Sequence, residues 1–285
     1  LSYEEFLRII AIVSRHGVRK VRITGGEPLV RKGIVDFISA VKGLGTIDDL
    51  SLTTNGSLLP LMAAELKAAG LDRVNISLDT IDAERFHQIT GNRGRLEDTL
   101  AGIDSALSAG LNPVKINVVL TEAFQEKDLA WFIAKVYDSP LSVRFIEYMP
   151  IGYGGAKAGM STATVRRLLE AAAGHLEPAS SGRGNGPARY VRLPGAKGTF
   201  GFITPLSEHF CGECNRIRLT ADGKLRPCLL SNQEIDVKSI LRSGGTDDMI
   251  ADAFFRTIAE KPAGHELCRT SGHGRFERTM SQIGG

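Results

Sequence analysis

Apolar, β-branched runs alternate with amphipathic segments through the first 173 residues of this chain. The spacing predicts strands at 18–24, 49–54, 73–79, 113–120 and 141–148, and helices at about 33–42, 57–69, 82–90, 96–109 and 125–138. A further helix is predicted at the start of the chain, where Ser2 and Glu5 have the spacing of a capping box. Strands separated by helices form parallel sheets with helical crossovers. The sequence therefore predicts an α/β fold, either a doubly wound sheet or a TIM-type barrel.

Polar side chains gather where these predicted strands end. They lie at Thr24 to Glu27, Thr53 to Gly56, Ser77 to Asp79, Asn117, and Glu147 to Met149. In both α/β architectures the carboxyl ends of the strands form the rim where active sites are built. Each of these short stretches also suits an ordinary turn or helix cap, so their convergence from five strands is what indicates a site. In the first stretch, glycines let the backbone approach a small molecule closely beside the Glu27 carboxylate.

The strand–helix alternation stops after a predicted helix at about 161–173. Residues 178–200 are rich in Gly, Pro and Arg, and we expect them to lead irregularly into a second, smaller domain. Short strands at 200–204 and 216–220 and helices near 236–242 and 246–260 are predicted there. The expected domains are therefore a barrel or sheet at 1–178 and an α+β domain at 179–285.

The composition is that of an ordinary globular protein, with 42% hydrophobic and 24% charged residues. The formal net charge of +3 is too small to indicate nucleic-acid binding. No apolar run approaches the roughly 18 residues that suggest a membrane span, and no secretory signal is recognisable. Four cysteines, three of them clustered, make a poor disulfide framework for so long a chain. These features favour a protein of the reducing cytoplasm that partners neither nucleic acid nor membrane.

The clustered cysteines have the spacing Cys211-x2-Cys214-x13-Cys228. Three thiolates brought together by a turn and a hairpin bind zinc or an iron–sulfur cluster, and spacing alone leaves both open. A structural zinc site would be completed by another ligand, such as His209 or Cys268. Three cysteine ligands around a cluster would instead leave one iron open to a substrate.

Two arginines follow the cysteine pair at alternate positions. Arg216 and Arg218 project to the same side of one predicted strand. On an exposed hairpin such charges are usually only solvated, whereas beside a metal site their planar guanidinium groups could hold an anionic or guanine-like ligand.

Seven segments, in order, resemble one enzyme family. They are VRITGGEPLVRKG, LTTNG, VNISLDT, VKINVVL, RFIEYMP, FCGECNRIRLTADGKLRPCL and the terminal SQIGG. This pattern resembles the GTP 3',8-cyclase family, radical S-adenosylmethionine (SAM) enzymes that begin molybdenum cofactor (molybdopterin) biosynthesis. The resemblance implies an incomplete (βα)6 TIM-type barrel and a smaller C-terminal α+β domain carrying an iron–sulfur cluster. It also implies conversion of GTP to (8S)-3',8-cyclo-7,8-dihydroguanosine 5'-triphosphate.

The resemblance also implies roles for individual residues. SAM contacts are implied for Gly26, Glu27, Ser77 and Met149. GTP contacts are implied for Arg22, Thr53, Lys115, Arg216, Ile217 and Arg218. Ligation of a 4Fe-4S cluster is implied for Cys211, Cys214 and Cys228, and a catalytic role for the terminal Gly284 and Gly285. Without the resemblance, Arg22 and Lys115 would be read as interior ion-pair partners and Met149 as a core residue.

One motif of the family is missing from this sequence. The family binds a second 4Fe-4S cluster through Cys-x3-Cys-x2-Cys on its first barrel strand, and the 285 residues contain no such motif. We expect that strand to lie upstream of Leu1, and we expect the chain as given to be inactive without it. A catalytically inactive fragment, or a nucleotide-binding protein with a structural metal site, is the alternative function.

A different enzyme class is a TIM-barrel lyase in which Lys115 forms a Schiff base assisted by Glu147, but it leaves the cysteines unexplained. As partners the resemblance implies GTP and SAM, a homodimer as the candidate assembly, and a cyclic pyranopterin monophosphate synthase that receives the product.

Overall fold

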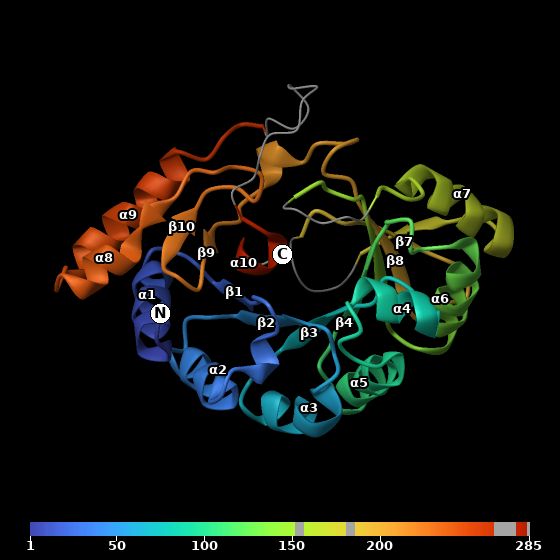
Figure 1. The fold of residues 1–285 in the computed structure, drawn as a ribbon, viewed down its shortest axis with the longest axis horizontal. Helices are drawn as coiled ribbons and strands as arrows, with labels where there is room; N and C mark the ends of the chain where they lie inside the picture. The colour runs from blue at the N-terminus through green and yellow to red at the C-terminus, as the bar shows by residue number, and fades with distance from the viewer. Residues whose placement is uncertain (152–156, 181–185, 265–277, 284–285) are drawn as a thin grey trace. The chain divides into compact units, whose positions relative to one another are not determined.

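The computed structural model of this chain describes residues 1–151, 157–180, 186–264 and 278–283 (Figure 1). The chain forms two compact units, which we call unit 1 and unit 2. Unit 1 contains residues 1–50, 150–154 and 209–285, and unit 2 contains residues 51–149 and 155–208. Contacts thus group the first 50 residues with the C-terminal part of the chain. The division into functional domains after residue 178 is not tested by this grouping and stays a prediction.

Unit 2 is built from the alternating strands and helices that the sequence predicts. Its elements are β2 (Asp49–Thr54, whose first two residues belong to unit 1), α3 (Leu59–Ala68), β3 (Arg73–Ser77), α4 (Ala83–Ile89), α5 (Leu96–Ser108), β4 (Val114–Val119), α6 (Glu126–Asp138), β5 (Ser142–Ile146), α7 (Thr162–Ala173), β6 (Glu177–Ala179), β7 (Arg189–Arg192) and β8 (Thr199–Ile203). The predicted elements before residue 174 are present, with their ends shifted by no more than two residues. The predicted α/β fold with parallel strands is therefore confirmed.

The sheet of unit 2 runs in the order β2-β3-β4-β5-β8, with all five strands parallel. Strands β7 and β6 extend it in antiparallel fashion beyond β8. Helices α3, α5 and α6 lie along the outer side of the strands (Figure 1). Ile76, Ile116 and Phe145 are fully buried, so the strands carry an apolar core that excludes water.

Strand β8 differs from the expectation for its part of the chain. The sequence predicts an irregular course for 178–200 and places the strand at 200–204 in the second domain. Instead β8 pairs in parallel with β5, with Val143 opposite Phe200. Helix α7 is thus the crossover of one more βα unit, and the β6–β7 hairpin is inserted between that helix and its strand. The insertion separated the two in sequence and concealed the repeat.

Unit 1 combines segments from both parts of the chain. Its elements are α1 (Tyr3–Arg15), β1 (Lys20–Ile23), the 3₁₀ turn η1 (Pro28–Val30), α2 (Ile34–Gly43), the 3₁₀ turn η2 (Cys211–Glu213), β9 (Arg218–Leu219), β10 (Lys224–Arg226), β11 (Ile235–Asp236), α8 (Val237–Arg242), α9 (Asp247–Ala259) and α10 (Met280–Ile283). Strands β11, β10 and β9 form a small antiparallel sheet in that order. The predicted capping box of α1 is confirmed, because Ser2 Oγ accepts from Glu5 N and Glu5 Oε2 accepts from Ser2 N.

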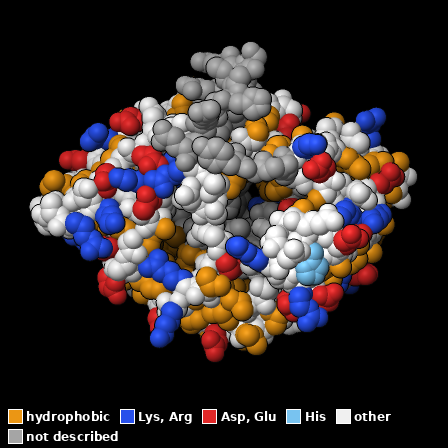
Figure 2. Space-filling model, in the orientation of Figure 1, with side chains coloured by type: hydrophobic (Ala, Val, Ile, Leu, Met, Phe, Trp, Pro, Cys, Tyr) orange, Lys and Arg blue, Asp and Glu red, His pale blue; other side chains and the backbone are white. Residues whose placement is uncertain are grey.

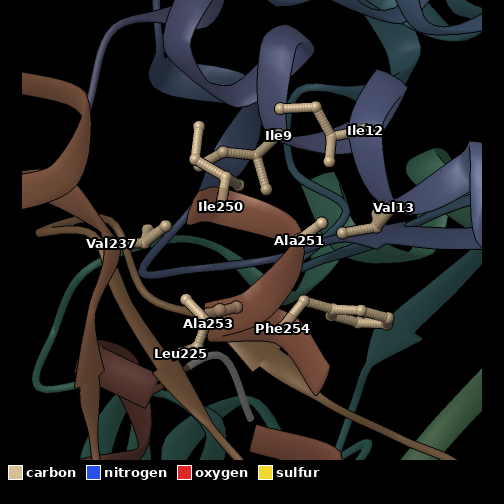
Figure 3. Close-up of a cluster of buried hydrophobic side chains, with 9 residues drawn as sticks. All are labelled: Ile9, Ile12, Val13, Leu225, Val237, Ile250, Ala251, Ala253 and Phe254. Carbon is tan, nitrogen blue, oxygen red and sulfur yellow. The ribbon is translucent and has the colours of Figure 1, made fainter. Parts of the chain in front are cut away.

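A buried apolar cluster holds unit 1 together (Figure 3). Its members are Ile9, Ile12 and Val13 of α1, Ile250, Ala251, Ala253 and Phe254 of α9, Leu225 of β10 and Val237 of α8. The amphipathic stripe of α1 therefore packs against α9, and the hairpin sheet is attached to the same core. On the surface, Asp247 forms ion pairs with both Arg8 and Arg15.

An ion-pair network connects the hairpin of β9 and β10 to Arg278 near the end of the chain. Arg278, just before α10, forms ion pairs with Asp222 at 2.8 Å and with Glu234 at 2.6 Å. Glu234 also pairs with Arg226, whose side chain is only 2% exposed. The two guanidinium groups lower the pKa of Glu234 although its partial burial opposes this. The hairpin is thus tied to the segment that carries α10.

Charges of both signs are interspersed on the face drawn in Figure 2. This is the distribution of an ordinary solvated surface, and it accords with the small net charge. None of the helices in the described residues is long and apolar enough to cross a membrane.

We expect Ile250→Ala to destabilise the protein by about 2–5 kcal/mol, because it opens a cavity in the cluster between α1 and α9. Ile250 is fully buried, whereas Ile258 on the same helix is 44% exposed. Ile258→Ala is therefore the matched control, and its effect should stay within about 0.5 kcal/mol. Urea unfolding followed by circular dichroism gives both values. Equal effects of the two substitutions would contradict the role assigned to the cluster.

Candidate functional site

One face of the unit 2 sheet is lined by polar residues in two adjacent rows. The first row, in register across five strands, is Thr53, Asn75, Lys115, Ser142 and Thr199. The second row, two residues further along each strand, is Ser77, Asn117, Arg144, Gly201 and Tyr190. Positions two apart on a strand share a face. We call this surface the polar face, and it contains three of the predicted contacts, Thr53, Ser77 and Lys115.

Arg144 lies near the middle of the polar face, where its side chain is buried. It donates to Asn75 Oδ1 at 2.8 Å and to Asn117 Oδ1. Its Nε is buried and has no hydrogen-bond partner among the described residues. Burial lowers the pKa of Arg144, and the nearby Tyr190 hydroxyl opposes that shift. A cation held by neutral amides keeps its charge available to an anionic ligand.

Lys115 is a second cation on the same face, and it is only 3% exposed. Its Nζ donates to the Tyr190 hydroxyl at 3.3 Å and lies 5.4 Å from the centre of that ring. Thr53 Oγ1 accepts a bond from the Asn75 amide, which also contacts Arg144. The predicted Thr53 and Lys115 are therefore brought onto one hydrogen-bonded surface.

The close approach of side chains on the polar face requires a glycine. A Cβ atom added at Gly201 would stand 2.9 Å from the Tyr190 ring and 3.3 Å from Cγ of Arg144. The absence of a side chain at Gly201 therefore leaves room for the Tyr190 ring and the Arg144 side chain.

Other predicted residues lie at or beyond the strand ends of unit 2. Ser77 is exposed as the last residue of β3, and Met149 is half-buried three residues after β5. Glu147 Oε2 accepts the backbone N–H groups of Leu206 and Ser207 at 2.7 and 3.0 Å. The Glu147 carboxylate thus holds a loop, which gives no support to the lyase alternative.

Asp79 is a titratable group at this rim that the sequence did not single out by itself. Its Oδ1 accepts the Val119 backbone N–H at 2.8 Å, which links the end of β3 to the end of β4. Burial raises the pKa of Asp79 to about 6, although the bond from Val119 favours the charged form. A carboxyl group that titrates near neutral pH next to Ser77 is a feature of functional sites.

In unit 1, the cysteine segment brings cationic groups close to thiols. Cys211, Cys214 and Cys228 are half-buried free thiols, and Leu230 N donates to Cys228 Sγ at 3.4 Å. Burial opposes ionisation of Cys214, but the backbone N–H and the charge of Arg216 outweigh it, so the pKa of Cys214 is lowered. In the described residues no three His, Cys, Asp or Glu side chains are placed together as they would be around a metal ion.

The predicted strand at 216–220 is shortened to β9, which begins at Arg218, so Arg216 lies before the strand. Ile217 packs against the apolar cluster of unit 1, and the charges of Arg216 and Arg218 lie close enough to interact. The Arg216 guanidinium lies 5.3 Å from the ring centre of Phe210. Burial lowers the pKa of Arg218 to about 10, as does the charge of Arg216, while the Cys228 and Cys214 thiols oppose the shift. Nε of Arg218 is buried with no hydrogen-bond partner in the described part of the chain.

The loop after β1 carries the remaining predicted residues of unit 1. Glu27 Oε1 accepts the Leu29 N–H at 3.0 Å and so caps η1, while Gly26 is exposed. Gly25 has φ +148°, which favours glycine at this bend. Arg22 is exposed on β1. The glycines thus shape the loop, and Glu27 has at least one structural bond in addition to any ligand.

Three predicted residues lie outside the described part of the chain. These are the terminal Gly284 and Gly285, for which a catalytic role is implied, and Cys268. Sequence reasoning also missed Asn75, Arg144 and Tyr190 of the polar face. Asn75 lies two residues before Ser77 and Arg144 three residues before Glu147, each between two apolar neighbours, and that interruption by a polar residue was the available signal.

Comparison with known proteins gives matches over nearly the whole chain. Residues 1–135 match the family described as the Radical SAM superfamily, and residues 141–267 match the family described as Molybdenum Cofactor Synthesis C. A curated relative named GTP 3',8-cyclase from Heliobacterium modesticaldum is 51% identical over 288 residues, covering 100% of this chain and 88% of the relative. Another of that name, from Pelotomaculum thermopropionicum, is 47% identical over 100% of this chain and 87% of the relative.

Solved structures share the fold at low sequence identity. The crystal structure of Streptococcus suis SuiB bound to S-adenosylmethionine matches with a TM-score of 0.62 and 16% identity. The match covers 88% of this chain and 60% of that chain. It supports the predicted incomplete TIM-type barrel for the parallel strands.

The raised pKa of Asp79 predicts how stability depends on pH. A carboxyl with a pKa of about 6 in the folded protein and about 4 in the unfolded chain binds its proton more tightly when folded. The protonated group therefore stabilises the fold fully below about pH 4, and this contribution is lost as the pH rises through 6.

Asp79→Asn keeps an oxygen that can accept the Val119 N–H but removes the titration. We expect this variant to match the parent at pH 4 and to be more stable by about 2–3 kcal/mol at pH 7.5. Urea unfolding at the two pH values measures the difference. A difference that is the same at both pH values would argue against burial of an ionisable Asp79.

Proposed function

This chain belongs to the GTP 3',8-cyclase family of radical SAM enzymes, and on that premise we propose which of its residues hold GTP, SAM and an iron–sulfur cluster. The family catalyses the first step of molybdenum cofactor biosynthesis. In that step GTP becomes (8S)-3',8-cyclo-7,8-dihydroguanosine 5'-triphosphate, which joins the ribose to the guanine base. The substrate thus presents a multiply charged triphosphate and a planar base with hydrogen-bonding edges.

The single observation that carries the proposal is the Nε of Arg218, buried without a partner beside two thiols. A buried unsatisfied donor costs about 1–3 kcal/mol and is retained where a ligand or ion satisfies it. Three free thiols in one segment, two of them next to this guanidinium, form the soft donor set that an iron–sulfur cluster needs. Their donor chemistry suits the cluster, although in the described residues the three thiols are not gathered as they would be around a metal ion. We propose Cys211, Cys214 and Cys228 as its ligands.

The cluster, when bound, would supply an iron coordination position open to a purine nitrogen. Beside it, Arg216 and Arg218 would hold the edge of the guanine, and the backbone of Ile217 would lie between them. Ile217 packs its side chain on the unit 1 core and so braces both arginines. The Arg216 guanidinium is further oriented by the Phe210 ring.

The polar face of unit 2 suits the triphosphate. Lys115 and Arg144 are both buried. Asn75 and Asn117 accept hydrogen bonds from Arg144, and the Tyr190 hydroxyl accepts one from Lys115. Thr53 adds a hydroxyl in the same row. We assign this surface to the phosphates and ribose of GTP. For Arg22 of unit 1 we separately propose a contact with GTP.

SAM would supply the hydrogen-abstraction chemistry that starts the reaction. We propose that the Glu27 carboxylate and the Gly26 backbone receive its ammonium group, and that Ser77 and Met149 contact the rest of it. An ionised carboxylate has about four lone-pair sites, so it can accept bonds from an ammonium group in addition to the Leu29 N–H. For Gly284 and Gly285, which lie outside the described residues, we propose a catalytic role.

We also propose a compartment, an oligomeric state and a partner enzyme for the protein. Free thiols and an oxygen-sensitive cluster require a reducing compartment, so we place the protein in the cytoplasm. We propose a homodimer, and a cyclic pyranopterin monophosphate synthase as the enzyme that receives the product. A second cluster, on a Cys-x3-Cys-x2-Cys segment, is proposed as the partner of SAM.

Replacing any one of Cys211, Cys214 and Cys228 by Ser should remove most of the iron bound after anaerobic reconstitution. The parent chain should bind about four irons at this site, because a 4Fe-4S cluster requires these thiolates. Cys268→Ser is the matched control and should keep the iron. Metal analysis and visible absorption give the result, and stoichiometric zinc without colour would overturn the assignment.

Arg216→Ala and Arg218→Ala should each weaken GTP binding by about 1–3 kcal/mol, the scale of a charge-assisted hydrogen bond. Arg242→Ala serves as the control, because Arg242 pairs with Glu5 on the surface of unit 1. Isothermal titration of the reconstituted protein with GTP measures the three affinities. GTP affinities equal to that of the control would show that the arginine pair is only solvated.

A further inference from the structure

Lys261 connects the two segments that carry the cysteines of unit 1. Its Nζ donates to the carbonyl oxygen of Arg216 at 2.8 Å and to the carbonyl oxygen of Pro227 at 2.8 Å. Arg216 lies two residues after Cys214, and Pro227 lies immediately before Cys228. One ammonium group therefore spans the two chain segments next to their thiols.

The strand pairing explains why a side chain is needed there. Strands β9 and β10 pair at Leu219 with Leu225 and at Arg218 with Arg226. The next residue of the second strand is Pro227, which has no backbone N–H to donate to a neighbouring strand. Lys261 supplies donors from outside the sheet at the point where the ladder of backbone bonds ends.

The position of Lys261 is itself fixed by the core. It directly follows the C-cap of α9, and its backbone N–H donates to the carbonyl oxygen of Ile258 at 3.1 Å. Helix α9 is anchored to α1 through the apolar cluster, which also contains Leu225 of β10. The ammonium group is thus held by a packed helix end, and its bonds carry that rigidity to the cysteine segments.

We propose that Lys261 is a positioning residue that sets the separation of Cys214 and Cys228 by joining the carbonyl groups of Arg216 and Pro227. The inference rests on the proposed function, which makes these two thiols ligands of one cluster. It adds a residue, distant in sequence from both cysteines, that prepares the site before any ligand binds.

The first test uses metal-free protein, so it does not depend on the cluster. In a Cys211→Ser, Cys268→Ser background, Cys214 and Cys228 are the remaining thiols and can be joined by the short cross-linker dibromobimane. Lys261→Met should slow this cross-linking by about fivefold or more, the factor expected for loss of one net hydrogen bond. Lys261→Arg, which keeps a cation with several donors, should restore most of the rate.

The matched control is Lys224→Met. Lys224 lies on β10 and pairs with Asp236 at 2.6 Å, so its loss weakens the same small sheet without releasing the cysteine segments. Its cross-linking rate should equal that of the parent. Equal rates for the parent and Lys261→Met, or an equal loss in both Met variants, would overturn the positioning role.

The second test uses the chain with all its cysteines after anaerobic reconstitution. Lys261→Met should release iron to a chelator faster than the parent and should change the electron paramagnetic resonance spectrum of the reduced cluster. Unchanged iron release and spectrum would overturn the inference. If the parent binds no iron while the difference in cross-linking persists, the cluster assignment fails and the positioning role of Lys261 stands.

Discussion

The packing of α1 against α9 is the interaction on which unit 1 depends. Ile9, Ile12 and Val13 meet four apolar residues of α9 in one buried cluster (Figure 3). The small sheet has little core of its own, since its strands are two or three residues long. Leu225 attaches this sheet to the cluster, and Lys261 connects the end of α9 to the cysteine segments. The positions of the cysteine segments thus depend on the packing of α1 against α9.

Unit 2 solves a different physical problem, because one face of its parallel sheet carries buried charged side chains, Lys115 and Arg144. A buried arginine and a buried lysine would each cost several kcal/mol without partners. Asn75, Asn117 and Tyr190 supply neutral hydrogen-bond partners and leave the positive charge uncompensated by carboxylates within this set. The apolar residues of the same strands, such as Ile76 and Phe145, provide the stability that this arrangement requires.

The sequence predicted the strands and helices before residue 174 well, because their periodicity is local. It also predicted the strand at 200–204, but not that this strand pairs with β5, because that pairing joins residues more than 50 positions apart across an inserted hairpin. Thr53 and Lys115 were found through a family resemblance, but their common row with Asn75 becomes visible only in the strand register. Arg144 was missed because its face of the sheet depends on how β5 is paired with its neighbours. The sequence alone does not give this strand register. Lys261 had no local signal, since its two acceptors are backbone atoms from distant segments.

Unit 1 is assembled from the first 50 residues and from residues after 208, and this has a consequence for synthesis on the ribosome. Arg8 of α1 and its partner Asp247 are separated by 239 positions in the chain. At about 5–20 residues per second, translation needs roughly 10–50 s to deliver α9 after α1 has emerged. During that interval Tyr3 and Phe6 of α1 can already meet Phe37 of α2, whereas Ile9, Ile12 and Val13 still lack the residues of α9 that bury them. The apolar stripe of α1 is therefore completed only when the last part of the chain has been made.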